Sequence, residues 1–275
     1  MDFEKWENLT ISNDFIFAKL MKDKTVCKEV IEKLLNIKIK DIKYIDEQKS
    51  INIRFDAKSI RLDVYLQADD KIYNIEMQVA DNKNLAKRSR YYQGLIDLDI
   101  IEKGETYNKL KDSFIIFICS FDPFNKGLAT YTFENICTED NKIKLDDKTK
   151  KIFFNAKAFE NVKDENLRTF LKFVNGQKDD NAFINMLNEK VEKIKQSKEW
   201  RQEYMTLLMR EQEIAEENFE QGVQQGIQQG IQQGIQQGII KQIKALKTVN
   251  VDEYKIIQMI IEDYGITEEE VKKYL

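Results

Sequence analysis

The stretch that decides the fold is residues 61–78, which read RLDVYLQADDKIYNIEMQ. It has the pattern of two short strands, 61–65 and 74–78, separated by turn-forming residues at 68–71. If Asp69 and Asp70 form a two-residue hairpin loop, the antiparallel register places Asp63 directly opposite Glu76. The sequence therefore predicts a β-hairpin that brings two carboxylates together.

The two faces of this hairpin differ in character. Side chains alternate along a strand, so Asn74, Glu76 and Gln78 share one face. Cross-strand neighbours have Cβ atoms roughly 4.5–5.5 Å apart, so Asp63 and Glu76 repel each other unless a cation joins them or one takes up a proton. This indicates a metal site; the simpler alternative is a solvent-exposed sheet face. The opposite face is predicted to point into the core, with Tyr73, Ile75, Met77 and Val79.

Length and composition indicate a folded chain. The 275 residues are 42% hydrophobic, which suits one main domain with an appendage. No run approaches the roughly 18 apolar residues of a membrane span, and the N-terminus lacks the profile of a secretory signal. We therefore expect a cytoplasmic protein without membrane contact. The net charge of −4 means that any nucleic-acid binding must be local.

The absence of histidine narrows the chemistry. It excludes catalytic triads with an imidazole base and metal centres built on histidine. The cysteines at 27, 119 and 137 are too dispersed for a zinc cluster. Carboxylates that hold Mg²⁺ or Mn²⁺ remain as the main catalytic option.

Along the chain, the pattern predicts an α/β fold in which helices pack against a mixed sheet. Residues 12–36 are expected to form one or two helices, with Ser12, Asn13 and Asp14 as the capping signal. Residues 84–103 are expected to form a further helix that Gly104 ends. From about residue 162 onward the pattern is helical. Strands are predicted near 41–46, 51–55, 60–66, 71–79, 113–119, 129–135 and 151–156.

The predicted helix at 84–103 has two stripes. Leu85, Tyr92, Ile96 and Ile100 form the stripe expected to face the core. A cluster of basic residues without an acidic one begins just before the helix, and it either is a solvated face or, beside a carboxylate pair, holds phosphates. Arg88 lies one turn before Tyr92 and can lean on it. The basic residues are Lys83, Lys87, Arg88 and Arg90.

The C-terminal part contains a repeat with period four at residues 221–239, here called the Gly repeat. Its glycines recur at every fourth position from 222 to 238, each followed by Val or Ile. Each Gly costs a helix about 1 kcal/mol relative to Ala, so a helix here is expected to need a partner helix. A flexible Gln/Gly-rich linker is the alternative. Beyond it, residues 251–264 are expected to form an amphipathic helix that Gly265 ends, and Thr267 with Glu270 predicts a capping box.

These motifs resemble those of a known family. The segments RLDV at 61–64, YNIEMQ at 73–78 and KRSRYYQG at 87–94 resemble the recombination-promoting nuclease (Rpn) family, a transposase-like branch of the PD-(D/E)xK nuclease superfamily. The likeness spans about residues 10–220 in the right order. Further matches are NDFIF at 13–17, FICSFDPF at 117–124, YTFEN at 131–135 and EWRQEYM at 199–205.

The resemblance implies a restriction-endonuclease-like core in which Asp63 and Glu76 hold Mg²⁺ or Mn²⁺, together with the backbone carbonyl of Met77. Such an ion would polarise a phosphodiester and lower the pKa of a bound water. Glu32 is the preferred candidate for an additional carboxylate, and Asp14 is the second choice.

Gln78 stands where many relatives have Lys, and an amide supplies no positive charge. Lys87 or Arg88 is the candidate to replace it, and both are counted with Gln78 among the catalytic residues. The expected nucleic-acid contacts are Lys83, Lys87, Arg88, Arg90 and Tyr91.

The resemblance thus implies a metal-dependent DNA endonuclease of low sequence specificity, linked to recombination, mobile elements or defence. The alternative is a catalytically idle nuclease fold whose helical tail joins copies of the chain or recruits a partner. The expected organisation is a nuclease-like domain at 1–160, a helical extension at 161–220, the repeat at 221–240 and a small helical tail module at 241–275.

Overall fold

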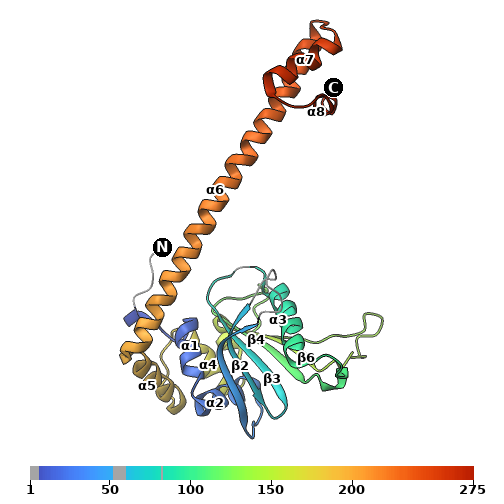
Figure 1. Cartoon of the computed structure of the whole chain (residues 1–275). Coiled ribbons are helices and arrows are strands. Elements are labelled where there is room, and N and C mark those ends of the chain that lie inside the picture. The colour runs from blue at the N-terminus through green and yellow to red at the C-terminus, as the bar shows by residue number, and fades with distance from the viewer. Residues whose placement is uncertain (1–5, 52–59, 82) are drawn as a thin grey trace. The chain divides into compact units, whose positions relative to one another are not determined.

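The computed structural model describes residues 6–51, 60–81 and 83–275 (Figure 1). The described residues form a six-stranded mixed sheet with the order β1-β2-β3-β4-β6-β5, which confirms the predicted α/β class. The predicted strand at 41–46 is longer than expected, and most of the one predicted at 51–55 lies outside the described residues. The strands are β1 (Ile42–Ile51), β2 (Ile60–Ala68), β3 (Lys71–Gln78), β4 (Asp112–Cys119), β5 (Thr130–Phe133) and β6 (Thr149–Asn155).

The β2–β3 hairpin has the predicted two-residue loop. Asp69 and Asp70 both adopt positive φ, 48° and 61°, as a type I′ turn requires. Antiparallel pairing runs from Ala68 opposite Lys71 to Val64 opposite Ile75, so the predicted register is confirmed. The Asp69 carboxylate also accepts hydrogen bonds from the backbone amides of residues 40 and 41, at 2.8 and 3.4 Å, which fixes the turn.

One prediction about this hairpin is wrong. Tyr73, Ile75 and Met77 are buried as expected, but Val79 is 58% exposed because β3 ends at Gln78. The polar face is not solvent-exposed either: Asn74 and Glu76 are buried beneath a helix. The hairpin is therefore covered on both faces at the position of the two carboxylates.

That helix is α3 (Leu85–Ile100), the crossover between the parallel strands β3 and β4. Its stripe packs against the sheet face that carries Ile72 and Phe117, as the apolar pattern predicts. α3 ends at Ile100, one turn before the expected end, because Ile101 adopts an extended conformation. Gly104, with φ of 95°, lies in the turn that follows.

Two helices precede the sheet, α1 (Asp14–Met21) and α2 (Lys24–Leu35), and they lie on the side of the sheet opposite α3 (Figure 1). The predicted cap is confirmed: the Asn13 side chain accepts a hydrogen bond from the amide of Ile16 at 3.2 Å. Asn36 ends α2 in the left-handed conformation. The remaining short helices are η1 (Trp6–Asn8), η2 (Tyr107–Lys109), η3 (Ala156–Asn161), α4 (Glu165–Val174) and α5 (Ala182–Gln196).

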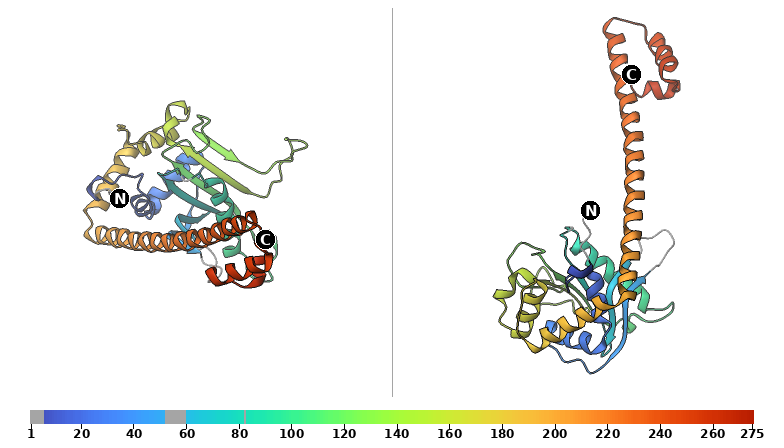
Figure 2. Two further views of the ribbon diagram at one scale, coloured as in Figure 1. Left: turned by 90° about the horizontal axis from the view of Figure 1, so that it is seen from above. Right: turned by 90° about the vertical axis from the view of Figure 1, so that its left-hand side faces the viewer.

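Contacts divide the chain into two compact units, Met1–Tyr204 and Met205–Leu275, with the border inside helix α6 (Lys198–Thr248). Within the first unit, Tyr204 packs against Trp6 and Phe15, with ring centroids 5.4 and 5.3 Å away. The first turns of α6 therefore belong to the unit that contains the sheet. Figure 2 shows α6 as one continuous helix from two further directions.

The second unit contains the Gly repeat, which is helical throughout and not an irregular linker. The end of α6 packs with α7 (Glu253–Tyr264) and α8 (Glu268–Lys272) around buried isoleucines such as Ile243 and Ile260. Gly265 ends α7 with φ of 64°, and the capping box of Thr267 and Glu270 is present, so both predictions are confirmed. No helix in the described part of the chain has the length and apolar character needed to span a bilayer.

Candidate active site

The site lies where the hairpin passes under α3. The backbone amide of Asp63 donates to Oε1 of Glu76 at 3.2 Å, and the amide of Met77 donates to Oδ2 of Asp63 at 2.9 Å. Each carboxylate is therefore held by the backbone of the opposite strand. This reciprocal pair fixes both side chains without occupying all of their oxygen lone pairs.

Arg88 connects this pair to Gln78. Its Nη1 donates to Oε1 of Gln78 at 2.7 Å, and its Nη2 lies 3.6 Å from Oε2 of Glu76. The same guanidinium donates to the Tyr92 hydroxyl at 2.8 and 3.3 Å, so the predicted contact between Arg88 and Tyr92 is confirmed. It also lies over the ring of Phe117, 5.7 Å from the centroid. Arg88 is thus the cation that reaches position 78.

The surroundings of Glu76 disfavour its charged form. Burial raises the pKa of Glu76 well above its usual range, and the charge of Asp63 raises it further, while Arg88 lowers it. Burial, followed by the charge of Glu76, likewise raises the pKa of Tyr92. At Glu76, burial and the charge of Asp63 outweigh the effect of Arg88, so a further cation beside this carboxylate would favour its charged form.

Asn74 lies on the same face of β3, two residues before Glu76, and is fully buried. It is close enough to Glu76 to favour the charged carboxylate, yet neither of its polar side-chain atoms has the geometry of a hydrogen bond. A buried polar group without a partner costs about 1–3 kcal/mol. Asn74 and Phe117 are site residues that the sequence prediction missed. The two-residue spacing to Glu76 was the signal for Asn74, whereas Phe117 required knowledge of the β3–β4 pairing.

The other predicted residues lie elsewhere. Lys83, Lys87, Arg90 and Tyr91 are exposed at the start and on the outer side of α3, and Lys87 makes no hydrogen bond or ion pair with the described residues. Asp14 lies at the start of α1, where its carboxylate accepts a hydrogen bond from the amide of the next residue.

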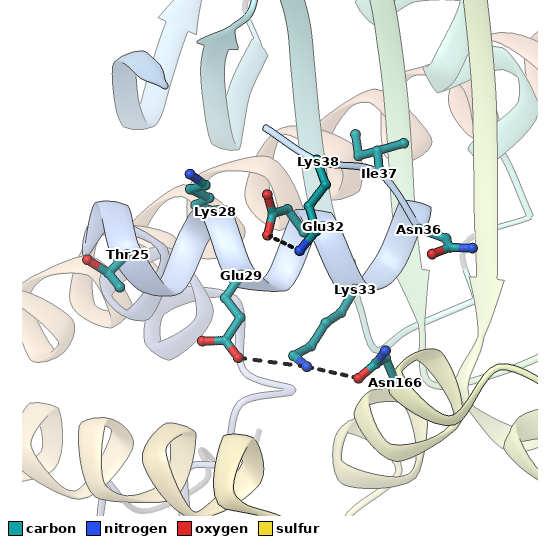
Figure 3. A pocket seen from close by; sticks show the side chains of 9 residues that line it. All are labelled: Thr25, Lys28, Glu29, Glu32, Lys33, Asn36, Ile37, Lys38 and Asn166. Atoms are coloured by element: carbon teal, nitrogen blue, oxygen red, sulfur yellow. Dashed lines mark hydrogen bonds and ion pairs between the residues drawn. The ribbon is translucent and has the colours of Figure 1, made fainter. Parts of the chain in front are cut away.

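Glu32 is committed to other contacts. Its Oε1 accepts a hydrogen bond from the amide of Ile39 at 2.8 Å, and its Oε2 pairs with Lys38 at 3.6 Å. Figure 3 shows it in a pocket of about 590 Å³ on α2, beside the ion pair of Glu29 and Lys33. None of the lining residues of this pocket comes from the hairpin. The structure therefore brings together Asp63, Glu76, Gln78 and Arg88, but not Glu32 or Lys87.

The donor set at the hairpin fits a hard divalent cation. It offers two carboxylates, pre-oriented by backbone amides, in a place where added positive charge is favourable. Among the described residues, no group of three His, Cys, Asp or Glu side chains is placed to hold a metal. The Met77 carbonyl, the third ligand expected from the sequence, accepts a hydrogen bond from Gln78 Nε2 at 2.8 Å.

Fold and site together define a nuclease-like protein, with paired carboxylates on a hairpin, a crossover helix that supplies a cation, and a mixed sheet behind them. A family model described as PD-(D/E)XK nuclease family transposase matches residues 11–225. Because this match covers most of the chain, the chain belongs to that family. Comparison with curated proteins and with solved structures gave no significant match.

Proposed function

We propose that this chain is a divalent-metal-dependent DNA endonuclease of low sequence specificity, which acts in recombination, mobile elements or defence. The observation that carries the proposal is the reciprocal pair of hydrogen bonds that aligns Asp63 and Glu76, with Arg88 beside them. Family membership supports the nuclease class. The metal and the DNA substrate are inferred from the site together with the family.

In this proposal Asp63, Glu76 and the Met77 carbonyl hold Mg²⁺ or Mn²⁺. When bound, the cation supplies Lewis-acid activation of the phosphodiester and of the attacking water. A carbonyl oxygen has two lone pairs, so the hydrogen bond from Gln78 leaves one for a metal. Glu32 is left out of this ligand set because both of its oxygens already have partners on the chain that follows α2.

The remaining residues act on the charge of the phosphate. Arg88, held by Gln78 and Tyr92, offers a fixed guanidinium that balances the charge developing on the scissile phosphate. The Gln78 amide fixes that guanidinium and does not itself carry charge. Lys83, Lys87 and Arg90 are exposed around the start of α3 and are proposed, with Tyr91, to contact phosphates away from the cleaved bond.

The test is cleavage of supercoiled plasmid DNA with Mg²⁺ or Mn²⁺ by the full chain, by Asp63→Asn and by Glu76→Gln. We expect nicking by the wild type alone, and none when EDTA is present. Thermal unfolding of each variant controls for loss of the fold. Cleavage that persists in both variants with EDTA present would contradict the proposal, because it would belong to a contaminant or to another site.

A second candidate function rests on the Gly repeat. Along this part of α6 the apolar residues Val223, Ile227, Ile231 and Ile235 are exposed. In the part of the chain that the structure describes, nothing lies within 4 Å of a Cβ added at Gly222, Gly226, Gly230 or Gly234. An exposed apolar ridge beside small residues suits a second helix. We propose that it joins copies of the chain. Light scattering of the full chain should give a multiple of the chain mass, and a chain that ends at Glu220 should form an oligomer with fewer copies. If both have the same number of copies, the repeat does not join the chains.

A further inference from the structure

Among the described residues, Asn74 is the one whose side chain is fully buried with neither polar atom hydrogen-bonded. It occupies an inner position of β3, where the neighbours along the strand include Tyr73 and Ile75. Asn is disfavoured in strands, and an apolar residue of the same size would fill the position without leaving a polar group unsatisfied. The fold alone therefore gives no reason for an amide here.

The neighbourhood of Asn74 gives one. Glu76 lies two residues further along on the same face, and its Oε1 accepts the amide of Asp63. Its Oε2 has Arg88 Nη2 at 3.6 Å, which is longer than a hydrogen bond. Among the described residues, no donor is hydrogen-bonded to Oε2, and the Asn74 amide, which is close enough to Glu76 to favour its charged form, is uncommitted.

The chemistry of an amide suits a carboxylate that must hold a metal. A second cationic donor would repel the metal ion, whereas an amide orients the carboxylate without adding charge. Residues that hydrogen-bond a metal ligand typically change metal affinity by about 10–100-fold when they are replaced.

We propose that Asn74 is a positioning residue, whose side-chain amide donates to the Glu76 carboxylate when the divalent cation is bound and so orients it. This inference rests on the proposed function, since it assigns Glu76 as a metal ligand. A positioning role affects metal affinity without lowering metal-free stability, whereas the loss of a merely structural residue would lower both. Loss of the amide should weaken metal binding while leaving the metal-free fold as stable as before, or more stable.

The experiment measures Mn²⁺ affinity by isothermal titration calorimetry and metal-free thermal unfolding for the full chain. Asn74→Leu replaces the amide by an apolar group with the same number and branching of heavy atoms. Asn74→Thr and Asn74→Val form an isosteric pair that differs in one hydroxyl donor. We expect Asn74→Leu and Asn74→Val to weaken Mn²⁺ binding about 10–100-fold. Asn74→Thr should retain more affinity than Asn74→Val, and the melting temperature of Asn74→Leu should not fall.

Gln93→Leu is the matched control. Gln93 is also buried between α3 and the sheet with an unsatisfied polar atom, but its amide nitrogen is bonded to Asp97 and Ser113, away from the carboxylate pair. This variant should change thermal stability and leave the Mn²⁺ dissociation constant within about twofold of the wild-type value, because Gln93 does not orient a metal ligand.

The outcomes separate the two proposals. If Glu76→Gln weakens Mn²⁺ binding but Asn74→Leu and Asn74→Val bind as the wild type does, the positioning role is wrong and the metal site stands. Equal affinity of the Thr and Val variants overturns the role as well, and so does a loss of affinity that is matched by a loss of metal-free stability. If Glu76→Gln binds Mn²⁺ like the wild type, the proposed metal site itself fails and the role of Asn74 fails with it.

Discussion

Arg88 Nη1 donates to Gln78 Oε1 at 2.7 Å, so the guanidinium from α3 is attached to the side chain at the end of β3. The neutral residue at position 78 and the cation ten residues later act as one unit. Positive charge is thus present beside Glu76 even though the strand itself supplies an amide. Both this pairing and the Gly repeat of α6 are open to direct test.

The first prediction concerns the choice between Arg88 and Lys87. Arg88→Ala should lower kcat for plasmid cleavage by about 10²–10³-fold, the usual effect of removing a group that stabilises transition-state charge. Lys87→Ala is the neighbouring control, since Lys87 is exposed and lacks a partner among the described residues. Lys87→Ala should weaken only the binding of DNA. It should also reduce the salt dependence of binding by the amount expected for about one lost phosphate contact. Cleavage by Arg88→Ala at the wild-type rate would remove Arg88 from the site.

The second prediction concerns the exchange of charge between positions 78 and 88. Gln78→Lys alone should destabilise the protein, because it places an ammonium beside the guanidinium of Arg88. The double variant Gln78→Lys/Arg88→Ala again has one cation at the site and should cleave DNA faster than Arg88→Ala. A double-mutant cycle of cleavage rates and melting temperatures checks this. Additive effects would show that the two positions are independent.

The third prediction concerns pH. The pKa of Glu76 is raised above its ordinary value of 4.5 by burial and by Asp63, so the folded chain holds a proton that the unfolded chain has already lost. The contribution of Glu76 to metal-free stability therefore falls as the pH rises above about 4.5. Each tenfold decrease in the acid dissociation constant of Glu76 on folding lowers the free energy of unfolding by about 1.4 kcal/mol, at pH values where Glu76 is ionised in both the folded and the unfolded chain. Glu76→Gln should flatten this part of the profile, measured by thermal unfolding between acid and neutral pH.

Metal addition provides the control for the pH prediction. Mg²⁺ should restore stability to the wild type at neutral pH, because it favours the ionised carboxylates, and it should leave Glu76→Gln nearly unchanged. Parallel pH profiles of the two proteins without metal would contradict the prediction.

The fourth prediction concerns the glycines of the repeat. A Cβ at Gly226 meets no atom of the described residues within 4 Å, so Gly226→Ala should stabilise α6 locally by about 1 kcal/mol. Gly238 is the matched position in the same repeat, where a Cβ would lie 2.9 Å from the Tyr264 hydroxyl. Gly238→Ala should therefore stabilise less, or destabilise the contact with α7. Hydrogen exchange of the full chain measures both, and equal protection in the two variants would argue against this packing.

Local patterns were enough to predict much of the fold. The β2–β3 register followed from two turn residues at 69 and 70, because a type I′ loop leaves one alignment of the strands. Caps were predicted equally well at Asn13 and at Thr267, where a side chain satisfies amides within its own helix turn. Each of these features depends on residues close together in sequence, which is why the sequence was sufficient.

Features that depend on distant segments were not predictable in the same way. The stacking of Arg88 on Phe117 depends on the parallel pairing of β3 with β4, and the burial of Asn74 depends on α3 crossing above it. Glu32 was a reasonable metal ligand by residue type. Its carboxylate is instead bonded to Ile39 and Lys38, because the left-handed Asn36 turns the chain back toward α2.

The left-handed turn of Asp69 and Asp70 has a consequence for the carboxylate pair. The residues between Asp63 and Glu76 measure out the distance along each strand, and a single inserted residue would shift the register and send Glu76 to the far side of the sheet. The turn thus sets the register that places Asp63 opposite Glu76. The alignment of the two carboxylates depends on the number of residues in the loop and not on any one side chain. Most substitutions would therefore leave it intact, whereas an insertion or a deletion would not.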